Sequence, residues 1–444
     1  MLVVDLRRPV EEDAFRRALA EGPVEDAFAL TPLAGWLLEQ AGVPYRGGGE
    51  LAEKAWFQAE GLRNTDRAEE AFAACFGAET DSWRGLLNRV KTLLDYALVE
   101  EKRWAALEAA GGRIIADVPQ ASRESLSWED HYYNRAALYF WGAASFAEVP
   151  RRAGGLPTLA GRLLNLTPAV VADKVLDRLA VGRRPAILTR YEGDWAAHKP
   201  WLRRRFGALS PERLAHEALA ASSETDAGRA EPEAAALVQA VRSRTSGLLP
   251  RSLPKVMAVL ENEATTYARL RRRLAGTAVA AARRHEVRAA LSVAASGYEE
   301  YLVHHYLKAA GIPTLFHQHG AYMSWPMFMR SAEVAPATHN FAYGSADLGF
   351  YEALGARAVV KAGCTGLPRK ALPAPGAGRY LYVLLHVEGN ALNVTSRLHF
   401  PDTDATASFR RHRRVAELFG RRKGVSLHIR EHPAAASWCL YEPL

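Results

Sequence analysis

Short apolar runs alternate with amphipathic stretches from the first residues of the chain. Residues 1–6 and 26–30 are apolar and have the length of buried strands. Residues 10–20 and 32–41 instead repeat their apolar positions with helical spacing, and Gly42 follows as a helix-ending residue. The segment directly after Gly42 is predicted to be extended. This alternation of strand and helix predicts an α/β protein with a parallel, doubly wound sheet.

Two largely helical stretches interrupt this alternation. Residues 50–110 and 128–284 have mostly the apolar spacing of helices, and we expect them to be insertions in an N-terminal domain. A strand is predicted between the two, at 112–119. Inside the second stretch, residues 185–195 indicate a strand that runs into a polar loop, and residues 221–233 have the composition of a mobile surface loop.

A strand–helix–strand unit follows the helical stretches. Residues 288–295 predict a strand, and Ser296 stands three residues before Glu299, the spacing of a capping box that begins a helix. Gly311 is positioned to end that helix, and the apolar residues 312–316 predict the second strand. This second strand leads directly into the most polar turn of the chain.

The polar turn holds two imidazoles, an amide and a glycine. Ligands of open α/β sheets bind beyond the carboxyl ends of strands, which makes His317 and His319 candidate catalytic residues. Gly320 tolerates a positive φ and allows a ligand to approach the backbone. The candidate substrate-binding residues near this turn are Gln318, Gly320, Tyr322 and Ser296.

Other strand ends carry further candidates. Glu192 and Asp194 lie in the loop that ends the strand at 185–190, and either carboxylate could deprotonate an acceptor hydroxyl. Acids in such a loop are also commonly no more than solvated surface groups. A later turn contains Gly363, Thr365 and Gly366, whose backbone N–H groups could cradle a phosphate. The same turn could instead be a hinge.

The C-terminal part begins after a segment rich in proline and glycine. Apolar runs at 379–386 and 425–429 predict strands of a new sheet, and 403–419 predicts a helix between them. The predicted domains are an N-terminal domain at 1–370 that holds both helical insertions, a linker at 371–378, and a partial C-terminal domain at 379–444.

Composition indicates a soluble globular protein of the cytoplasm. The hydrophobic fraction is 49% and the charged fraction 24%, both ordinary for that class. The chain has 3 cysteines and no CxxC pair, which favours reduced thiols. We find no apolar run long enough to span a bilayer, and charged residues break up the N-terminus where a signal peptide would be apolar.

Arginine carries most of a formal net charge of +8. Three runs, at 203–205, 271–273 and 410–414, are either solvated helix faces or attractive surfaces for phosphates. Peripheral contact with the inner face of an anionic membrane is one expectation from them. Nucleic acid is not an expected partner, because basic residues are interspersed with acidic ones and no helix-turn-helix, zinc-finger or RNP-like pattern occurs.

Residues 281–433 contain, in this order, the motifs SGYEE, GIPTLFHQHGAY, FAYGS, GCTG and LHIREHP. Their order resembles that of bacterial GT-B-type glycosyltransferases that build surface and capsular carbohydrates. The resemblance implies two Rossmann-like domains across a cleft, with the acceptor on the N-terminal side and the donor on the C-terminal side. The implied partners are a nucleotide-activated sugar and a carbohydrate or lipid-linked acceptor, with no bound metal and no further cofactor. Arg430 and His432 match an (R/K)xHP motif that binds donor phosphates.

Only residues 434–444 follow that motif, so the C-terminal domain is predicted to be incomplete, and whether this short chain is active stays open. Two other functions remain open. The chain could be a truncated, non-catalytic relic that serves as a partner protein. It could also be a metal-dependent hydrolase, because His317 and His319 alternate as HxH metal ligands do. The two histidines could equally be hydrogen-bonded turn residues.

Overall fold

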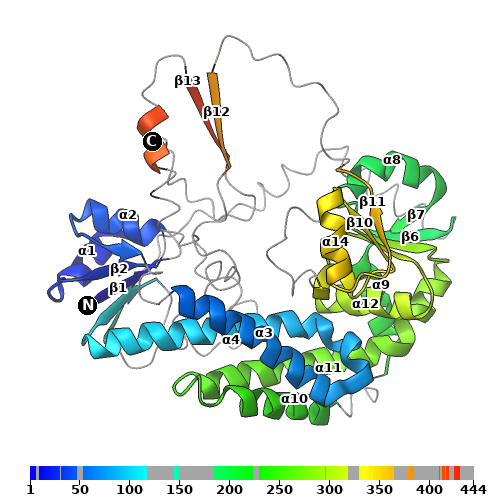
Figure 1. Cartoon of the computed structure of the whole chain (residues 1–444), viewed down its shortest axis with the longest axis horizontal. Coiled ribbons are helices and arrows are strands. Elements are labelled where there is room, and N and C mark those ends of the chain that lie inside the picture. Colours follow the sequence, from blue (N-terminus) through cyan, green and yellow to red (C-terminus); the bar gives the residue numbers. More distant parts are fainter. Residues whose placement is uncertain are drawn as a thin grey trace.

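Three parallel sheets, of five, six and two strands, make up the β structure of the described residues (Figure 1). The computed structural model describes residues 1–6, 10–30, 32–47, 54–117, 145–149, 184–223, 230–295, 297–318, 330–364, 379–384, 410, 413–415, 417–419 and 425–430. The α/β class and the parallel pairing that the sequence predicts are therefore confirmed. The two larger sheets are compatible with two Rossmann-like domains.

The five-stranded sheet has the order β3-β2-β1-β4-β5. Its strands are β1 Leu2–Asp5, β2 Ala27–Ala29, β3 Arg46–Gly47, β4 Arg113–Ala116 and β5 Ser145–Glu148. Alternate residues of β1 face opposite sides: Leu2 and Val4 pack with helices α1 (Glu12–Ala20) and α2 (Pro32–Gln40), whereas Val3 belongs to the core shared with longer helices. The sheet is thus covered on both faces.

The six-stranded sheet has the order β11-β10-β9-β8-β6-β7. Its strands are β6 Ala186–Thr189, β7 Gly207–Leu209, β8 Ala289–Ser292, β9 Thr314–His317, β10 His339–Ala342 and β11 Val359–Lys361, and its helices include α8 Trp195–Arg205, α9 Pro211–Ala220, α12 Tyr298–Ala309 and α14 Ser345–Ala353. Ile187 packs with α8 on one face, and Leu188 packs with α9 and α12 on the other. The chain reverses its direction of travel across the sheet between β6 and β8.

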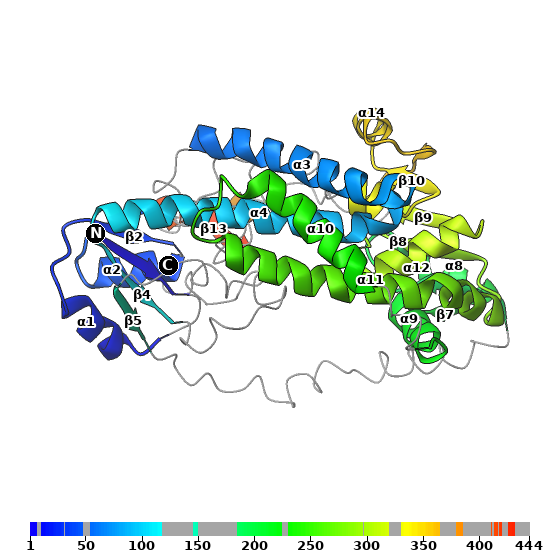
Figure 2. The same ribbon diagram turned by 90° about the horizontal axis from the view of Figure 1, so that it is seen from below.

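Four long helices lie between the two larger sheets (Figures 1 and 2). They are α3 Lys54–Phe76, α4 Thr80–Ala109, α10 Ala230–Thr245 and α11 Leu253–Arg284. Helix α4, with 30 residues, is about 45 Å long and reaches from one sheet to the other. Near its start the buried Trp83 contacts Tyr267 of α11, with ring centroids 5.5 Å apart, and its end leads directly into β4.

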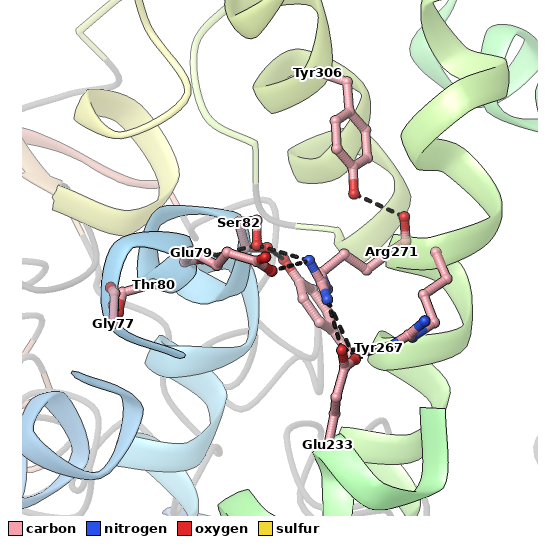
Figure 3. Close-up of polar contacts among 9 residues, drawn as sticks. Gly77, Glu79, Thr80, Ser82, Glu233, Tyr267, Arg271 and Tyr306 are labelled. Carbon is pink, nitrogen blue, oxygen red and sulfur yellow. Dashed lines mark hydrogen bonds and ion pairs between the residues drawn. The ribbon is translucent and has the colours of Figure 1, made fainter. Parts of the chain in front are cut away.

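Arg271 of α11 links this helix to α10 and to the 3-10 turn between α3 and α4 (Figure 3). Its guanidinium Nη1 lies 2.9 Å from Oε2 of Glu79 in the 3-10 turn between α3 and α4, and its Nη2 lies 3.1 Å from Oε1 of Glu233 in α10. Arg272 pairs with the same Glu233, and Arg273 donates to Ser222 Oγ at 2.9 Å. The run 271–273 is therefore used in contacts within the chain and is not an open phosphate-binding surface.

Tyrosine hydroxyls complete the same junction. Tyr267 donates to the carbonyl oxygen of Ser82 at 2.8 Å, and Tyr306 of α12 donates to the carbonyl oxygen of Arg271 at 2.7 Å (Figure 3). The two carbonyl oxygens lie within α4 and α11 and provide acceptors for these hydroxyls where the helices pack. The junction fixes α11 against α4 and α12.

Gly85 allows the close packing of α4 at this junction, which yields a prediction about its replacement. A Cβ at Gly85 would lie 2.7 Å from Tyr267 Oη and 2.7 Å from Tyr301 Cδ1, whereas a Cβ at Gly276 in α11 would meet nothing within 4 Å. We expect Gly85→Ala to lower the free energy of unfolding by about 1–3 kcal/mol because of overpacking. Gly276→Ala should raise it by about 0.5–1 kcal/mol through helix propensity. Urea unfolding of both variants measures this, and a stabilising Gly85→Ala would contradict the packing.

The C-terminal segment forms a small parallel sheet from β12 (Arg379–Leu384) and β13 (Val425–Arg430). Helical residues between these strands contact the first sheet's helix α2 and the loop after it: Arg410 donates to the carbonyl oxygen of Tyr45 at 2.8 Å, and Arg413 pairs with Glu39. Both predicted C-terminal strands are confirmed. Residues 1–370, assigned above to one domain, carry two separate sheets, and the domain boundaries stay a prediction.

The structure differs from the sequence-based expectation at several element positions. Strands β5 and β7 fall within the stretch 128–284 that was predicted to be helical apart from one strand. Each is short, and each is held by parallel pairing with a neighbour, β4 or β6, so a tertiary partner outweighs local pattern. Helix α10 begins at Ala230, inside the loop predicted at 221–233. The N-cap of α12 is Gly297, with no side-chain capping bond, and not Ser296.

Most other elements follow the prediction within a few residues. Gly42 and Gly311 have φ of +70° and +77°, the left-handed conformation expected at helix ends. Strands β1, β2, β4, β6, β8 and β9 overlap the segments predicted for them. Among the helices that the structure describes, none is long and apolar enough to cross a membrane.

Candidate functional site

Three strand-end segments meet at the carboxyl edge of the six-stranded sheet. Asp194 follows β6, His317 ends β9, and Cys364 follows β11. His317 Nδ1 lies 3.2 Å from Asp194 Oδ2, and Cys364 Sγ lies 3.7 Å from the other carboxylate oxygen of Asp194. Both His317 and Asp194 are almost fully buried, at 3% and 2% exposure. Two residues predicted separately from the sequence as catalytic therefore lie in contact.

A strained turn after β6 positions Asp194. Tyr191 has φ of +55° and Gly193 φ of +54°, and Tyr191 N donates to Thr189 Oγ1 at 2.9 Å. A non-glycine residue in this conformation is costly and persists only where the surroundings fix it, often at functional sites. Asp194 then becomes the N-cap of α8 without a side-chain capping bond, and its carboxylate faces His317.

Aromatic rings enclose the His317 imidazole. The Trp195 ring stands edge-on to it with centroids 6.0 Å apart, Phe341 lies parallel to it at 6.2 Å, and Tyr343 is 5.3 Å away. Trp195 is itself fixed, because its Nε1 donates to the Ser292 carbonyl oxygen at 2.8 Å. The imidazole is thus held in one orientation by packing on several sides.

This environment favours a neutral imidazole. Burial lowers the pKa of His317 below its ordinary value, and the negative charge of Asp194 opposes that shift without cancelling it. Backbone groups of Gln318 and Gly363 also act to raise the pKa. A neutral imidazole with a carboxylate at Nδ1 is suited to accept a proton at Nε2.

A second polar cluster lies at the point where the chain order reverses, between β6 and β8. Arg190 Nη1 is 3.2 Å from Oε1 of the buried Glu300 and 3.5 Å from Oε1 of Glu192. Burial raises the pKa of Glu300 to about 7, and Arg190 opposes the shift. Ligands of doubly wound sheets bind beside such reversal points. Glu192 is 44% exposed and is seen here as a partner of Arg190.

Gln318 joins two strand ends. Its backbone N donates to the Phe341 carbonyl oxygen at 2.9 Å, and its side-chain Oε1 accepts from Tyr343 N at 2.9 Å. This arrangement fixes the segment after β10 beside His317. Gly363 begins the predicted phosphate turn with φ of +74°. The substrate-binding roles of Gln318 and Gly363 stay predictions.

The remaining candidates are not brought to this site by the described structure. Arg430 ends β13 in the separate two-stranded sheet. Residues that lie outside the described part of the chain are Ser296, His319, Gly320, Tyr322, Thr365, Gly366 and His432.

Sequence reasoning missed four contributors, namely Trp195, Glu300, Tyr343 and Cys364. Glu300, Tyr343 and Cys364 lie inside the motifs SGYEE, FAYGS and GCTG, and Trp195 ends the segment 185–195, so position in a motif at a strand end was the available signal. No signal in the sequence indicated the contact between Cys364 and Asp194, because this contact depends on how the turn after β11 lies across the sheet edge.

Within the described residues, no group of three or more histidine, cysteine or acidic side chains is arranged to hold a metal ion. His319, the second member of the HxH pair, is outside that part, so the metal-dependent hydrolase stays a hypothesis. We found no matching protein family, curated protein or solved structure. Fold and site therefore define an α/β protein with a buried His–Asp pair at a carboxyl sheet edge.

Proposed function

We propose that this chain is a GT-B-like glycosyltransferase of bacterial surface-polysaccharide biosynthesis. It would transfer a sugar, or a related group, from a nucleotide-activated donor to a carbohydrate or lipid-linked acceptor. The observation that carries the proposal is the contact of His317 with Asp194 where three strand-end segments meet. The two parallel sheets with helices on both faces support it, since nucleotide-binding folds have this architecture.

In this proposal His317 acts as the general base. Its Nε2 takes the proton of the acceptor hydroxyl, the acceptor oxygen bonds to the anomeric carbon, and the bond from that carbon to the donor phosphate oxygen breaks. The electron pair of the broken bond leaves with the nucleotide. Asp194 lies 3.2 Å from Nδ1 without a hydrogen bond to it, and its negative charge stabilises the imidazolium that forms.

The proposal revises which parts of the chain form the two halves of a GT-B enzyme. The sequence-based division separates 1–370 from 379–444. The five-stranded sheet at residues 1–149 and the six-stranded sheet at residues 184–364 are better matched in size, and each is doubly wound. The turn of Gly363, Thr365 and Gly366 stays the candidate for the donor phosphates, through backbone N–H groups other than that of Gly363, which donates to the Ala342 carbonyl oxygen at 3.3 Å.

Thermal unfolding with added nucleotides tests the proposal. A nucleoside mono- or diphosphate, or a nucleotide sugar, should raise the melting temperature, with a stabilisation of about 2.7 kcal/mol when the ligand is roughly 100-fold above its Kd. Asp194→Asn should keep this response, because it removes a charge beside the base and leaves the phosphate-binding turn. If no nucleotide or nucleotide sugar of a panel covering all common bases shifts the melting temperature, the proposal is wrong.

A further inference from the structure

Helix α8 presents an exposed tryptophan among cationic side chains. Trp201 is 52% exposed, the highest value among the large apolar side chains of the described residues. The neighbouring face of α8 is fixed to the sheet through Leu202, which packs with Ile187 and Leu291. The helix contains Lys199 and the run 203–205 but no aspartate or glutamate. A rigid, basic surface with one indole ring results.

This run differs from the other two arginine runs of the chain. Arg271 and Arg272 are paired with Glu233, and Arg413 is paired with Glu39. Arg204 and Arg205, in contrast, are exposed on α8. The structure thus distinguishes the three runs, which the sequence could not: two make contacts with acidic side chains, whereas Arg204 and Arg205 of the third are exposed and Arg203 lies over the Tyr191 ring.

The indole and the guanidinium form one unit. Arg205 Cζ lies 4.3 Å from the centre of the Trp201 ring, within the range of a cation–π contact. Arg184, which is also exposed, donates to the carbonyl oxygens of Arg203 and Arg204 at 3.0 Å and adds positive charge at the same end of the helix. The tryptophan and the positive charges therefore lie close together on the surface, toward the C-terminal end of α8.

We propose that α8 is a docking surface for an anionic lipid bilayer. Tryptophan partitions to the interface between lipid headgroups and acyl chains, and arginine binds headgroup phosphates. A basic face without carboxylates is complementary to the negative potential of a membrane that contains anionic lipids. The helix, 11 residues long and packed along the sheet, would lie flat on the headgroups and not insert.

The same helix begins at the candidate site. Its N-cap Asp194 contacts His317, and its first residue Trp195 packs on the imidazole. Docking through α8 would hold the carboxyl edge of the six-stranded sheet at a fixed distance from the bilayer. This would suit a lipid-linked acceptor, but binding of α8 to lipid does not depend on the proposed glycosyl transfer.

Vesicle flotation with the full chain tests this surface. We expect binding to vesicles of phosphatidylcholine with about 30 mol % phosphatidylglycerol, weaker binding at about 0.5 M NaCl, and none to pure phosphatidylcholine. Arg204→Glu/Arg205→Glu should raise the lipid concentration for half-binding by at least about tenfold, and Trp201→Ala by about threefold. The matched control is Arg16→Glu/Arg17→Glu, which reverses two neighbouring exposed arginines on α1 and should bind as the wild type does.

Equal loss in the two double variants would overturn the assignment to α8, because net charge alone would then explain binding. Equal binding to both kinds of vesicle, or no binding to either, would overturn the proposal outright. So would tighter binding to nucleic acid or to an acidic protein than to anionic vesicles at the same salt concentration. Unchanged thermal unfolding of each variant confirms that the surface and not the fold was altered. Nucleotide protection is measured without lipid, so failure here leaves the proposed function standing.

Discussion

Replacing His317 with alanine is expected to lower the turnover number of glycosyl transfer by about 10²–10⁴-fold, the usual contribution of a general base. The imidazole is the group that Asp194 contacts and that three aromatic rings enclose. The assay is release of the nucleotide product at saturating donor, in the presence of a nucleotide sugar that protects the chain in thermal unfolding.

The matched control is His339→Ala. His339 is an exposed histidine at the start of β10, the strand that pairs with β9, and its loss should leave turnover unchanged. Asp194→Asn gives an independent readout: because the Asp194 charge raises the pKa of His317, its removal should move the acid limb of the pH–rate profile to lower pH. Normal turnover in His317→Ala would remove the base from the mechanism.

The second large expected effect is a fall in the free energy of unfolding as the pH rises, caused by the buried carboxyl of Glu333. Glu333 lies in a π-helical turn, Arg330–Val334, and is fully buried. Tyr351 Oη donates to its Oε2 at 2.5 Å, while its Oε1 has no hydrogen-bond partner among the described residues. Burial raises the pKa of this carboxyl to about 8 from an ordinary 4.5, so the folded chain keeps it protonated at neutral pH.

The sign of the pH effect follows from proton binding. Between pH 4.5 and about 8 the unfolded chain releases this proton and the folded chain does not. The free energy of unfolding should therefore fall by about 1.4 kcal/mol per pH unit across this window from Glu333 alone, and it should be highest below the window. Glu300 contributes with the same sign up to about pH 7.

Glu333→Gln should remove the contribution of Glu333, because an amide stays neutral throughout. Urea unfolding at pH 5, 6, 7 and 8 should give a slope against pH that is shallower than that of the wild type by about 1.4 kcal/mol per unit. Glu352→Gln, one residue from Tyr351 and exposed, is the matched control and should keep the wild-type slope. Equal slopes in wild type and Glu333→Gln would show that the carboxyl is ionised in the folded chain.

The sequence was sufficient for elements whose pattern is local. The strand at 1–6 is an apolar run, and the helix after it has a clear apolar spacing, so both were placed within a few residues. Strand β5 has only four residues, and its pairing with β4 depends on a segment far away in the chain. No local signal distinguishes such a strand from the helical stretch around it.

Individual residues of the site were predictable from the sequence, but the contact between them was not. His317 and Asp194 were each recognised because they follow apolar strands, but their contact requires the order β9-β8-β6, which folding decides. The sequence pattern also gave no sign that residues 1–370 carry two separate sheets, because strand order is decided by folding. The burial of Glu333 had no sequence signal, because a π-helical turn and its tyrosine partner arise only from packing.

The most direct test of the account is to find where a nucleotide sugar binds. The full chain is irradiated with a photoreactive analogue of the nucleotide sugar that protects it, and the labelled peptides are identified by mass spectrometry. We predict label in the segments around 190–195, 317–318 and 343–364, and loss of that label when unlabelled nucleotide sugar competes. Label confined to the five-stranded sheet at residues 1–149, or label that unlabelled nucleotide sugar does not displace, would contradict a nucleotide-sugar site at the His317–Asp194 edge.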